Sequence, residues 1–254
     1  MGGRRVPRGG LFVPSAFAAA ALAVLIGLGA WQVERLQWKR GLIAALAERL
    51  SAPPRPLPPP PSWASLDRAA LEFRHVVFSA EFLHDKEALV FTAGSNLRPD
   101  VSGPGYWVFT PARLPGGSLV MVDRGFVPET AKDPARRAAG QITGLVDIIG
   151  VLRWPEERGR FTPADDPGRN LWFVRDPQAV AEAKGLGRVA PFYVAQESPL
   201  PPGDLPRAGK LAPNLPNRHL EYALTWFGLA LVLAAVFAAW LLGRRRSPGT
   251  TRPP

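Results

Sequence analysis

The residue types that can carry catalysis or bind a metal are few in this chain. Its 254 residues include no cysteine and three histidines, His75, His84 and His219. The absence of cysteine excludes disulfides, thiolate metal sites, iron–sulfur ligation and thiol catalysis. The chain also has no G-x-S-x-G nucleophile elbow, no phosphate-binding P-loop and no H-E-x-x-H pair. The sequence therefore does not indicate an enzyme.

Two of the histidines fall in a segment with the pattern of a β-strand. His75 and His84 are nine residues apart, and strand alternation places residues at odd spacing on opposite faces. We therefore expect no shared metal site. Because so few other ligands accompany them, we interpret both as partly exposed strand histidines.

His219 differs because of its position, three residues before a long uncharged segment. At that position a membrane helix would meet water. If the helix begins a turn before the uncharged segment, His219, Tyr222 and Trp226 fall at i, i+3 and i+7 and share one face.

A similar spacing occurs where the other uncharged segment ends, at Trp31, Arg35 and Trp38. If the two faces meet, they form a cleft with aromatic walls, one imidazole and one guanidinium. Imidazole is a common axial ligand of haem iron, and arginine pairs with haem propionates. The candidate haem-binding residues are then His219, as iron ligand, with Trp31, Arg35, Tyr222 and Trp226. The alternative is an ordinary aromatic belt, because these residue types are tolerated at membrane helix ends without any ligand.

Two segments long enough to cross a membrane position these residues. Residues 11–30 and residues 222–242 contain no charged side chain. A helix rises ~1.5 Å per residue, so each segment reaches about 30 Å, the thickness of a bilayer's hydrocarbon core. The first segment is longer than the ~7–15 apolar residues of a signal peptide, so we expect an uncleaved anchor.

The net charge of +10 indicates membrane topology and not nucleic-acid binding. Seven arginines and no acidic residue lie in the terminal tails, 1–10 and 243–254. Lys and Arg beside a span are retained on the cytoplasmic side, whereas long domains translocate largely regardless of charge. We therefore expect both termini in the cytoplasm and the central domain in the periplasm. The ten-residue leader is too short for an organelle transit peptide, which favours a bacterial inner membrane. The lipid bilayer is thus an expected partner, and nucleic acid is not.

The region between the spans has a mainly β pattern. Short stretches rich in β-branched and aromatic residues alternate with Pro/Gly turns. They predict strands at 74–82, 88–92, 106–110, 119–122, 145–152, 171–174 and 192–196, with a hairpin connection at 114–119. Short helices are expected at 62–70 and 177–184, the second starting at Asp176 and Pro177, which suit a cap and first turn. The fold class is therefore a membrane protein in which two transmembrane α-helices bracket a mainly antiparallel β (α+β) extracytoplasmic domain.

These patterns divide the chain into eight parts. In order they are a cytoplasmic tail (1–10), the first transmembrane helix (11–31), its helical extension (32–50), a proline-rich linker (51–62), the extracytoplasmic β-rich domain (63–198), a Pro/Gly-rich return segment (199–217), the second transmembrane helix (218–242) and a basic cytoplasmic tail (243–254).

Three stretches form motifs in a fixed order along the chain. Residues 29–39 read G-A-W-Q-V-E-R-L-Q-W-K, residues 123–128 read D-R-G-F-V-P after G-Y at 105–106 and T-P at 110–111, and residues 217–227 read N-R-H-L-E-Y-A-L-T-W-F. Together they resemble the surfeit locus protein 1 family, which are assembly factors of cytochrome c oxidase. The chain departs from the family pattern at Asp123, where Asn is usual, at Phe126, where Trp is usual, and at Arg218, where a second Asn is common.

The resemblance implies a role in maturing subunit I of haem-a-containing oxidases. In bacterial members it further implies haem a binding, with the histidine at the second anchor, here His219, as candidate iron ligand. The implied partners are cytochrome c oxidase subunit I and other assembly factors. The alternative is a membrane-anchored interaction scaffold that stabilises an oxidase assembly intermediate without binding cofactor. A membrane-tethered enzyme is a third reading, which requires a catalytic pocket in the β-domain.

Overall fold

The computed structural model describes residues 11–212 and 216–246. The expected tail at 1–10 and most of the one at 243–254 lie outside these residues. The chain divides into two compact units, Met1–Ala44 with Pro216–Pro254, and Ala45–Leu215. Two long apolar helices, α1 (Phe12–Ser51) and α4 (His219–Arg246), bracket a β-rich region. The predicted fold class is confirmed: this is a membrane protein with two transmembrane helices around a central sheet domain.

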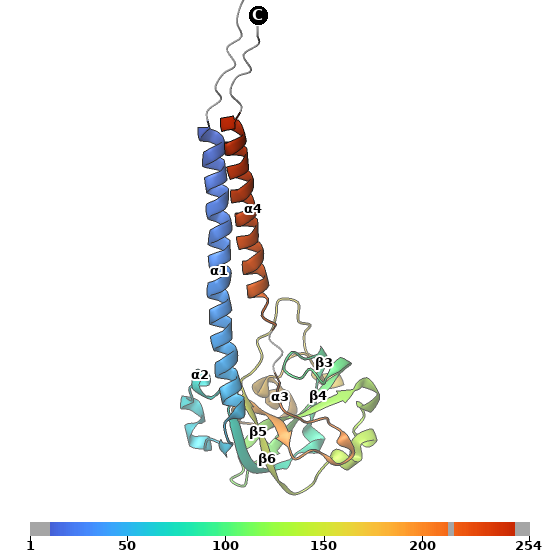
Figure 1. Ribbon diagram of the computed structural model, residues 1–254. Coiled ribbons are helices and arrows are strands. Elements are labelled where there is room, and N and C mark those ends of the chain that lie inside the picture. Colours follow the sequence, from blue (N-terminus) through green and yellow to red (C-terminus); the bar gives the residue numbers. More distant parts are fainter. Residues whose placement is uncertain (1–10, 213–215, 247–254) are drawn as a thin grey trace, which may run out of the picture. The chain divides into compact units, whose positions relative to one another are not determined.

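The first unit is an antiparallel pair formed by α1 and α4, which run side by side in Figure 1. Their most apolar windows have mean hydropathies of 2.1 and 2.2. Small residues, Gly29 on α1 and Ala223 and Ala230 on α4, lie on the buried faces. A Cβ at Gly29 would lie 2.6 Å from the Phe227 ring. Such small residues let two membrane helices approach closely.

The second unit is built on one eight-stranded sheet, in the order β1-β2-β6-β8-β5-β4-β3-β7. The strands are β1 (Arg55–Pro56), β2 (His75–Phe82), β3 (Ala88–Gly94), β4 (Ser102–Arg113), β5 (Leu119–Pro128), β6 (Leu145–Arg153), β7 (Leu171–Trp172) and β8 (Val189–Ser198). An additional pairing joins β2 to β4 at Phe82 and Ala112. Strands β2, β6, β8, β5 and β4 therefore form a closed ring, as in a small barrel.

Most neighbouring strands in this sheet are antiparallel, but three pairs are parallel: β1 with β2, β3 with β7, and β5 with β8. Alternate residues of β5 pack in different clusters. Val120 packs with Leu152 and Phe192, while Met121 packs with Phe109 and Tyr193. Both faces of the central strands are thus covered, which explains their nearly continuous apolar sequence.

The helices of this unit are short. They are α2 (Arg68–Leu71), α3 (Pro177–Lys184) and the 3₁₀ segments Pro60–Ser65, His84–Lys86, Glu129–Ala131, Pro134–Gly140, Pro167–Arg169 and Pro202–Asp204. The start predicted for α3 is confirmed, because the Asp176 side chain accepts hydrogen bonds from the backbone amides of Gln178 and Ala179. The single helix expected at 62–70 is instead two pieces, since Asp67 caps a new helix by accepting from the Ala69 amide.

The structure differs from expectation at the proline-rich segment, 51–62, which is part of the domain and not a free linker. Arg55 and Pro56 form β1, which pairs in parallel with β2. The Trp63 indole donates to the Pro58 carbonyl at 2.8 Å, and Leu57 packs against the core. An extended proline-rich chain offers carbonyl acceptors and apolar rings but few backbone N–H donors. It can therefore cover a sheet edge where few N–H donors are required of it.

The described part of the expected return segment, 199–217, also packs on the sheet. Phe126 and Arg207 exchange backbone hydrogen bonds of 3.1 and 2.8 Å. Gly125, the residue before Phe126, has a φ of +119°, and a Cβ there would lie 2.2 Å from the Arg207 carbonyl oxygen. Glycine is therefore required at this position for the two backbones to meet.

Candidate functional site

The most specific polar contact of the helix pair joins His219 to Gln32. His219 is the first residue of α4, and its Nδ1 lies 2.7 Å from Gln32 Oε1. Because an amide oxygen can only accept, His219 donates this hydrogen bond from Nδ1. In the neutral imidazole the lone pair then lies on Nε2, which makes no hydrogen bond within the described residues.

The surroundings of this pair explain why it forms. Gln32 is 9% exposed and lies between Gly29 and Leu36 on the buried face of α1. A buried amide that lacks a partner is costly, so the imidazole N–H satisfies it. Two turns further from the span, Lys39 donates from Nζ to the Pro216 carbonyl at 2.5 Å.

The other residues predicted for the site do not converge on His219. Trp31 and Tyr222 are 47% and 53% exposed, and Arg35 is also exposed. Trp226 is half-buried and lies on α4 two turns after His219. The face of α1 that carries Trp31 and Arg35 does not pack against α4, because α1 turns Gly29, Gln32 and Leu36 inward.

Arg35 has a different environment from the one expected. Its guanidinium carbon lies 5.6 Å from the centroid of the Trp31 ring and 5.5 Å from that of Trp38. These distances are typical of cation–π contacts. Within the described residues Arg35 has no carboxylate partner, so its charge is held only by two aromatic rings on the outer surface of α1.

Gln32 is the site residue that sequence reasoning missed, although it lies inside the first motif. A signal was present: Gly29 and Gln32 are spaced i, i+3, so a small residue and a polar one share a face at the end of an apolar span. In membrane helices such a face is typical of helix contact, because polar side chains there hydrogen-bond across the pair.

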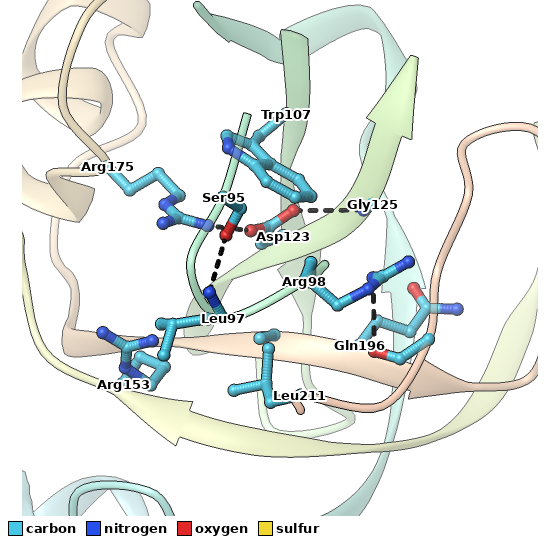
Figure 2. Close-up of a pocket in the computed structure, with 12 residues that line it drawn as sticks. Ser95, Leu97, Arg98, Trp107, Asp123, Gly125, Arg153, Arg175, Gln196 and Leu211 are labelled. Atoms are coloured by element: carbon cyan, nitrogen blue, oxygen red, sulfur yellow. Dashed lines mark hydrogen bonds and ion pairs between the residues drawn. The ribbon is translucent and has the colours of Figure 1, made fainter. Parts of the chain in front are cut away.

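The β-domain holds a second buried polar cluster, centred on Arg175 (Figure 2). Its Nη1 donates to Asp123 Oδ2 at 2.7 Å, and its other donors reach the Glu156 carboxylate. The guanidinium also lies 5.1 Å from the Trp107 ring and 5.6 Å from the Tyr193 ring. Figure 2 shows Arg175 and Asp123 pointing toward each other beside Trp107.

Burial and charge oppose each other in this cluster. Burial alone lowers the pKa of Arg175, but its interactions with Tyr193, Glu156 and Asp123 raise that pKa well above its usual value. Burial alone raises the pKa of Glu156, and Arg175 reverses this and lowers it. The adjoining cavity encloses about 10 Å³, which is about the space of one water. The cluster therefore stabilises the fold and leaves no room for a substrate.

The two remaining histidines are half-buried and have separate partners. His75 Nε2 lies 2.9 Å from Glu197 Oε2. His84 Nε2 lies 2.8 Å from the Ile142 carbonyl, and Arg124 Nη1 lies 3.3 Å from His84 Nδ1. Among the residues that the structure describes, no three His, Asp or Glu side chains are grouped as metal ligands.

Nearly the whole chain is similar to known proteins of one family. Residues 19–231 match the SURF1 family. Surfeit locus protein 1 of Rattus norvegicus is 34% identical over 249 residues, covering 94% of this chain and 76% of the relative. The SURF1-like protein of Monosiga brevicollis is 35% identical, with 91% and 88% covered. Surfeit locus protein 1 of Homo sapiens is 36% identical, with 88% and 75% covered. Since the match includes the Gln32 and His219 motifs and the sheet between them, the chain belongs to the SURF1 family.

Proposed function

We propose that this SURF1-family protein assists the assembly of cytochrome c oxidase by binding haem a at the His219 end of α4 and aiding its insertion into subunit I. Family membership supports the assembly role, and the resemblance of the motif around His219 supports the cofactor. Subunit I and other assembly factors are the proposed partners. The protein acts as a binding and delivery factor, not as an enzyme.

One observation supports this proposal more than any other: the hydrogen bond from His219 Nδ1 to Gln32 Oε1. Histidines that bind metals almost always donate their other ring N–H to a fixed acceptor, which sets the tautomer and the ring orientation. Gln32 supplies that acceptor, so His219 Nε2 is available as a ligand before any metal arrives. The donor set therefore fits a haem.

The other predicted residues, which lie on the same helix ends but not against His219, have chemistry that suits the rest of such a ligand. Haem a would supply an iron, and His219 Nε2 would be the nitrogen that holds it. Arg35 has no carboxylate partner in the described part of the chain and is free to pair with a propionate. Trp31, Tyr222 and Trp226 provide aromatic surface, and the exposed Trp31 and Tyr222 remain accessible to a ligand or a partner helix.

The proposed location is a bacterial inner membrane, with both termini in the cytoplasm and residues 45–215 in the periplasm. The support is the arginine-rich composition of both tails, because such residues are retained on the cytoplasmic side. Alkaline phosphatase fused after residue 153 should be active, and the same enzyme fused after residue 246 should be inactive. The reverse pattern would invert the topology.

The test of haem binding uses the full chain, purified in detergent from membranes that synthesise haem a. We expect a Soret band in the wild type and its loss in His219→Ala. His75→Ala serves as the matched control, since His75 pairs with Glu197 in the β-domain, and it should keep the band.

A colourless wild type would exclude the cofactor and favour the scaffold alternative. In that case His219→Ala should leave oxidase activity intact, while changes on the buried faces of α1 and α4 should reduce it. If both wild type and His219→Ala carry haem equally, another residue is the ligand and the assignment to His219 is wrong.

A further inference from the structure

A cavity of about 340 Å³ opens where the chain leaves α1 and enters β1. Its volume is in the range of small-molecule sites. It lies entirely within the unit Ala45–Leu215. The lining residues are Ala45, Glu48, Arg49, Ala52, Pro53, Arg55, Arg74 and His75.

The fold brings three arginines together at this cavity. Arg49 lies in the last turn of α1, and Pro53 and Pro54 then turn the chain into β1. Arg55 pairs in parallel register with Val76 of β2, which places it near Arg74, the residue just before that strand. The Arg74 backbone is fixed, because its N–H donates to the Leu71 carbonyl and its carbonyl accepts from the Leu152 amide.

These arginines have few acidic side chains near them to neutralise their charge. Glu48 is the one acidic residue that lines the cavity. Neither Arg55 nor Arg74 makes a side-chain hydrogen bond or an ion pair within residues 11–212 and 216–246, and Arg49 donates only to the Glu72 carbonyl, at 3.3 Å. By contrast, three arginines with largely buried side chains in this domain are paired with carboxylates: Arg98 with Asp100, Arg137 with Glu87, and Arg175 with Asp123.

His75 lies on the other side of the cavity. It lines both this cavity and an adjoining one of about 420 Å³, which also contains Lys210. The acidic residue there, Glu197, is already engaged: one oxygen faces His75 Nε2 and the other accepts from the Leu211 amide at 3.2 Å. The buried His75 Nδ1 has no partner in the described part of the chain.

We propose that this cavity is a binding site for a small oxyanion, a molecule with a phosphate or carboxylate group held between Arg55 and Arg74. Planar guanidinium forks match both groups in geometry and bind them with two parallel hydrogen bonds. Arg49, already anchored to Glu72, supplies further positive charge. This site is separate from His219 and does not depend on haem binding.

The test uses the full chain in nanodiscs of uncharged phosphatidylcholine. Sodium phosphate and sodium succinate are titrated at constant ionic strength, and binding is followed by calorimetry and by the midpoint of thermal unfolding. We expect saturable binding of at least one of these anions. Arg55→Gln and Arg74→Gln should each weaken it at least about tenfold, the loss expected for one charge-assisted hydrogen bond.

Arg188→Gln is the matched control, because Arg188 is also exposed, forms no ion pair among the described residues and lies outside both cavities. It should bind the anion like the wild type. A second arm replaces part of the phosphatidylcholine with phosphatidylglycerol, to distinguish a lipid headgroup from a free anion. A rise in the unfolding midpoint that Arg74→Gln abolishes and Arg188→Gln keeps would support a lipid source.

The proposal is overturned if none of the three probes, phosphate, succinate and phosphatidylglycerol, gives saturable binding or a saturable rise in the unfolding midpoint. It is equally overturned if Arg188→Gln weakens binding as much as Arg74→Gln does, because general surface charge would then explain the result. Circular dichroism of each variant checks that the β-domain is intact, and the conservative pair Arg55→Lys and Arg74→Lys, which keeps the charges, should retain part of the affinity.

Discussion

His219 Nδ1 and Gln32 Oε1 lie 2.7 Å apart and form the hydrogen bond that joins the two membrane helices. The other contacts on these faces are made by small or apolar residues, among them Gly29, Phe227 and Ala223. A directional bond between side chains in a mostly apolar interface fixes the register of the helices and the orientation of the imidazole together.

Gln32→Leu is expected to weaken haem binding by about 10–100-fold, because loss of an outer-shell partner typically has that effect on metal affinity. The measurement is a titration followed at the Soret band. Gln37→Leu is the control, since Gln37 is exposed on the same helix. The ¹⁵N shifts of the His219 ring give an independent readout, which should show an Nδ1–H tautomer in the wild type and a mixture in Gln32→Leu. Unchanged shifts would contradict the role of Gln32.

Gly29→Ala is expected to destabilise the helix pair by about 1 kcal/mol, because the added Cβ overpacks the interface. That Cβ would lie 2.6 Å from the Phe227 ring. Gly27→Ala is the matched control on the same helix, since no atom lies within 4 Å of its added Cβ. Thermal unfolding in detergent measures both. Adding Phe227→Leu to Gly29→Ala should restore part of the loss, and equal effects of the two glycine variants would contradict the contact.

Arg175→Met is expected to destabilise the β-domain by about 3–5 kcal/mol, because it leaves the buried carboxylate of Asp123, and the partly buried one of Glu156, without the Arg175 counter-charge. Urea unfolding followed by tryptophan fluorescence measures the change. The control is Arg169→Met, which removes an arginine whose side chain is 83% exposed beside Asp166. Its effect should be much smaller, since water screens exposed ion pairs. Similar losses would mean that the Arg175 cluster contributes little.

The stability of the β-domain should fall as the pH drops below 6.5, in part through His84. Burial lowers the pKa of His84 below its usual 6.5, and the charges of Arg124 and Arg137 lower it further. The hydrogen bond to the Ile142 carbonyl and the charge of Glu87 raise this pKa, but they do not reverse the shift. Burial also lowers the pKa of Arg124 to about 10, so it stays charged in this range. The unfolded chain therefore binds the His84 proton at a higher pH than the folded chain, and acid favours unfolding.

The measurement for His84 is the free energy of unfolding between pH 5 and pH 7.5. In His84→Gln the slope against pH should be shallower than in the wild type, because the titrating group is gone. The glutamine amide keeps one donor and one acceptor for Ile142 and Arg124. A slope that does not change with this substitution would show that other groups cause the acid sensitivity.

Local signals in the sequence predicted local structure well. Asp176 and Pro177 marked the start of α3, and the turn between β4 and β5 followed from its glycines. Long-range pairing was not visible, because the parallel contact of β5 with β8 and the closure of β2 on β4 depend on register and not on composition. The predicted strand at 119–122 was too short, because β5 continues to Pro128. The charged pair Asp123 and Arg124 is typical of a turn in sequence, but both side chains are buried in the structure.

The candidate site could be predicted only in part. The position of His219 at the start of α4 followed from the apolar segment after it, and the helix start there is confirmed. The choice of Gln32 over Trp31 and Arg35 as the residue facing it did not follow, because two faces of α1 carry plausible partners, one with Trp31 and Arg35 and the other with Gln32. Which face packs is decided by the smallest side chain, here Gly29, and not by the most chemically versatile one.

The closed ring of β2, β6, β8, β5 and β4 has a consequence for self-association. Outside the ring the sheet ends in β1 and β7, which are two residues long each. Long unpaired strand edges are templates on which other chains add and aggregate, and short ones offer almost no such template. A domain of this kind, held at high local concentration on a membrane, offers little template for edge-to-edge polymerisation apart from residues 91–94 of β3, which β7 does not cover.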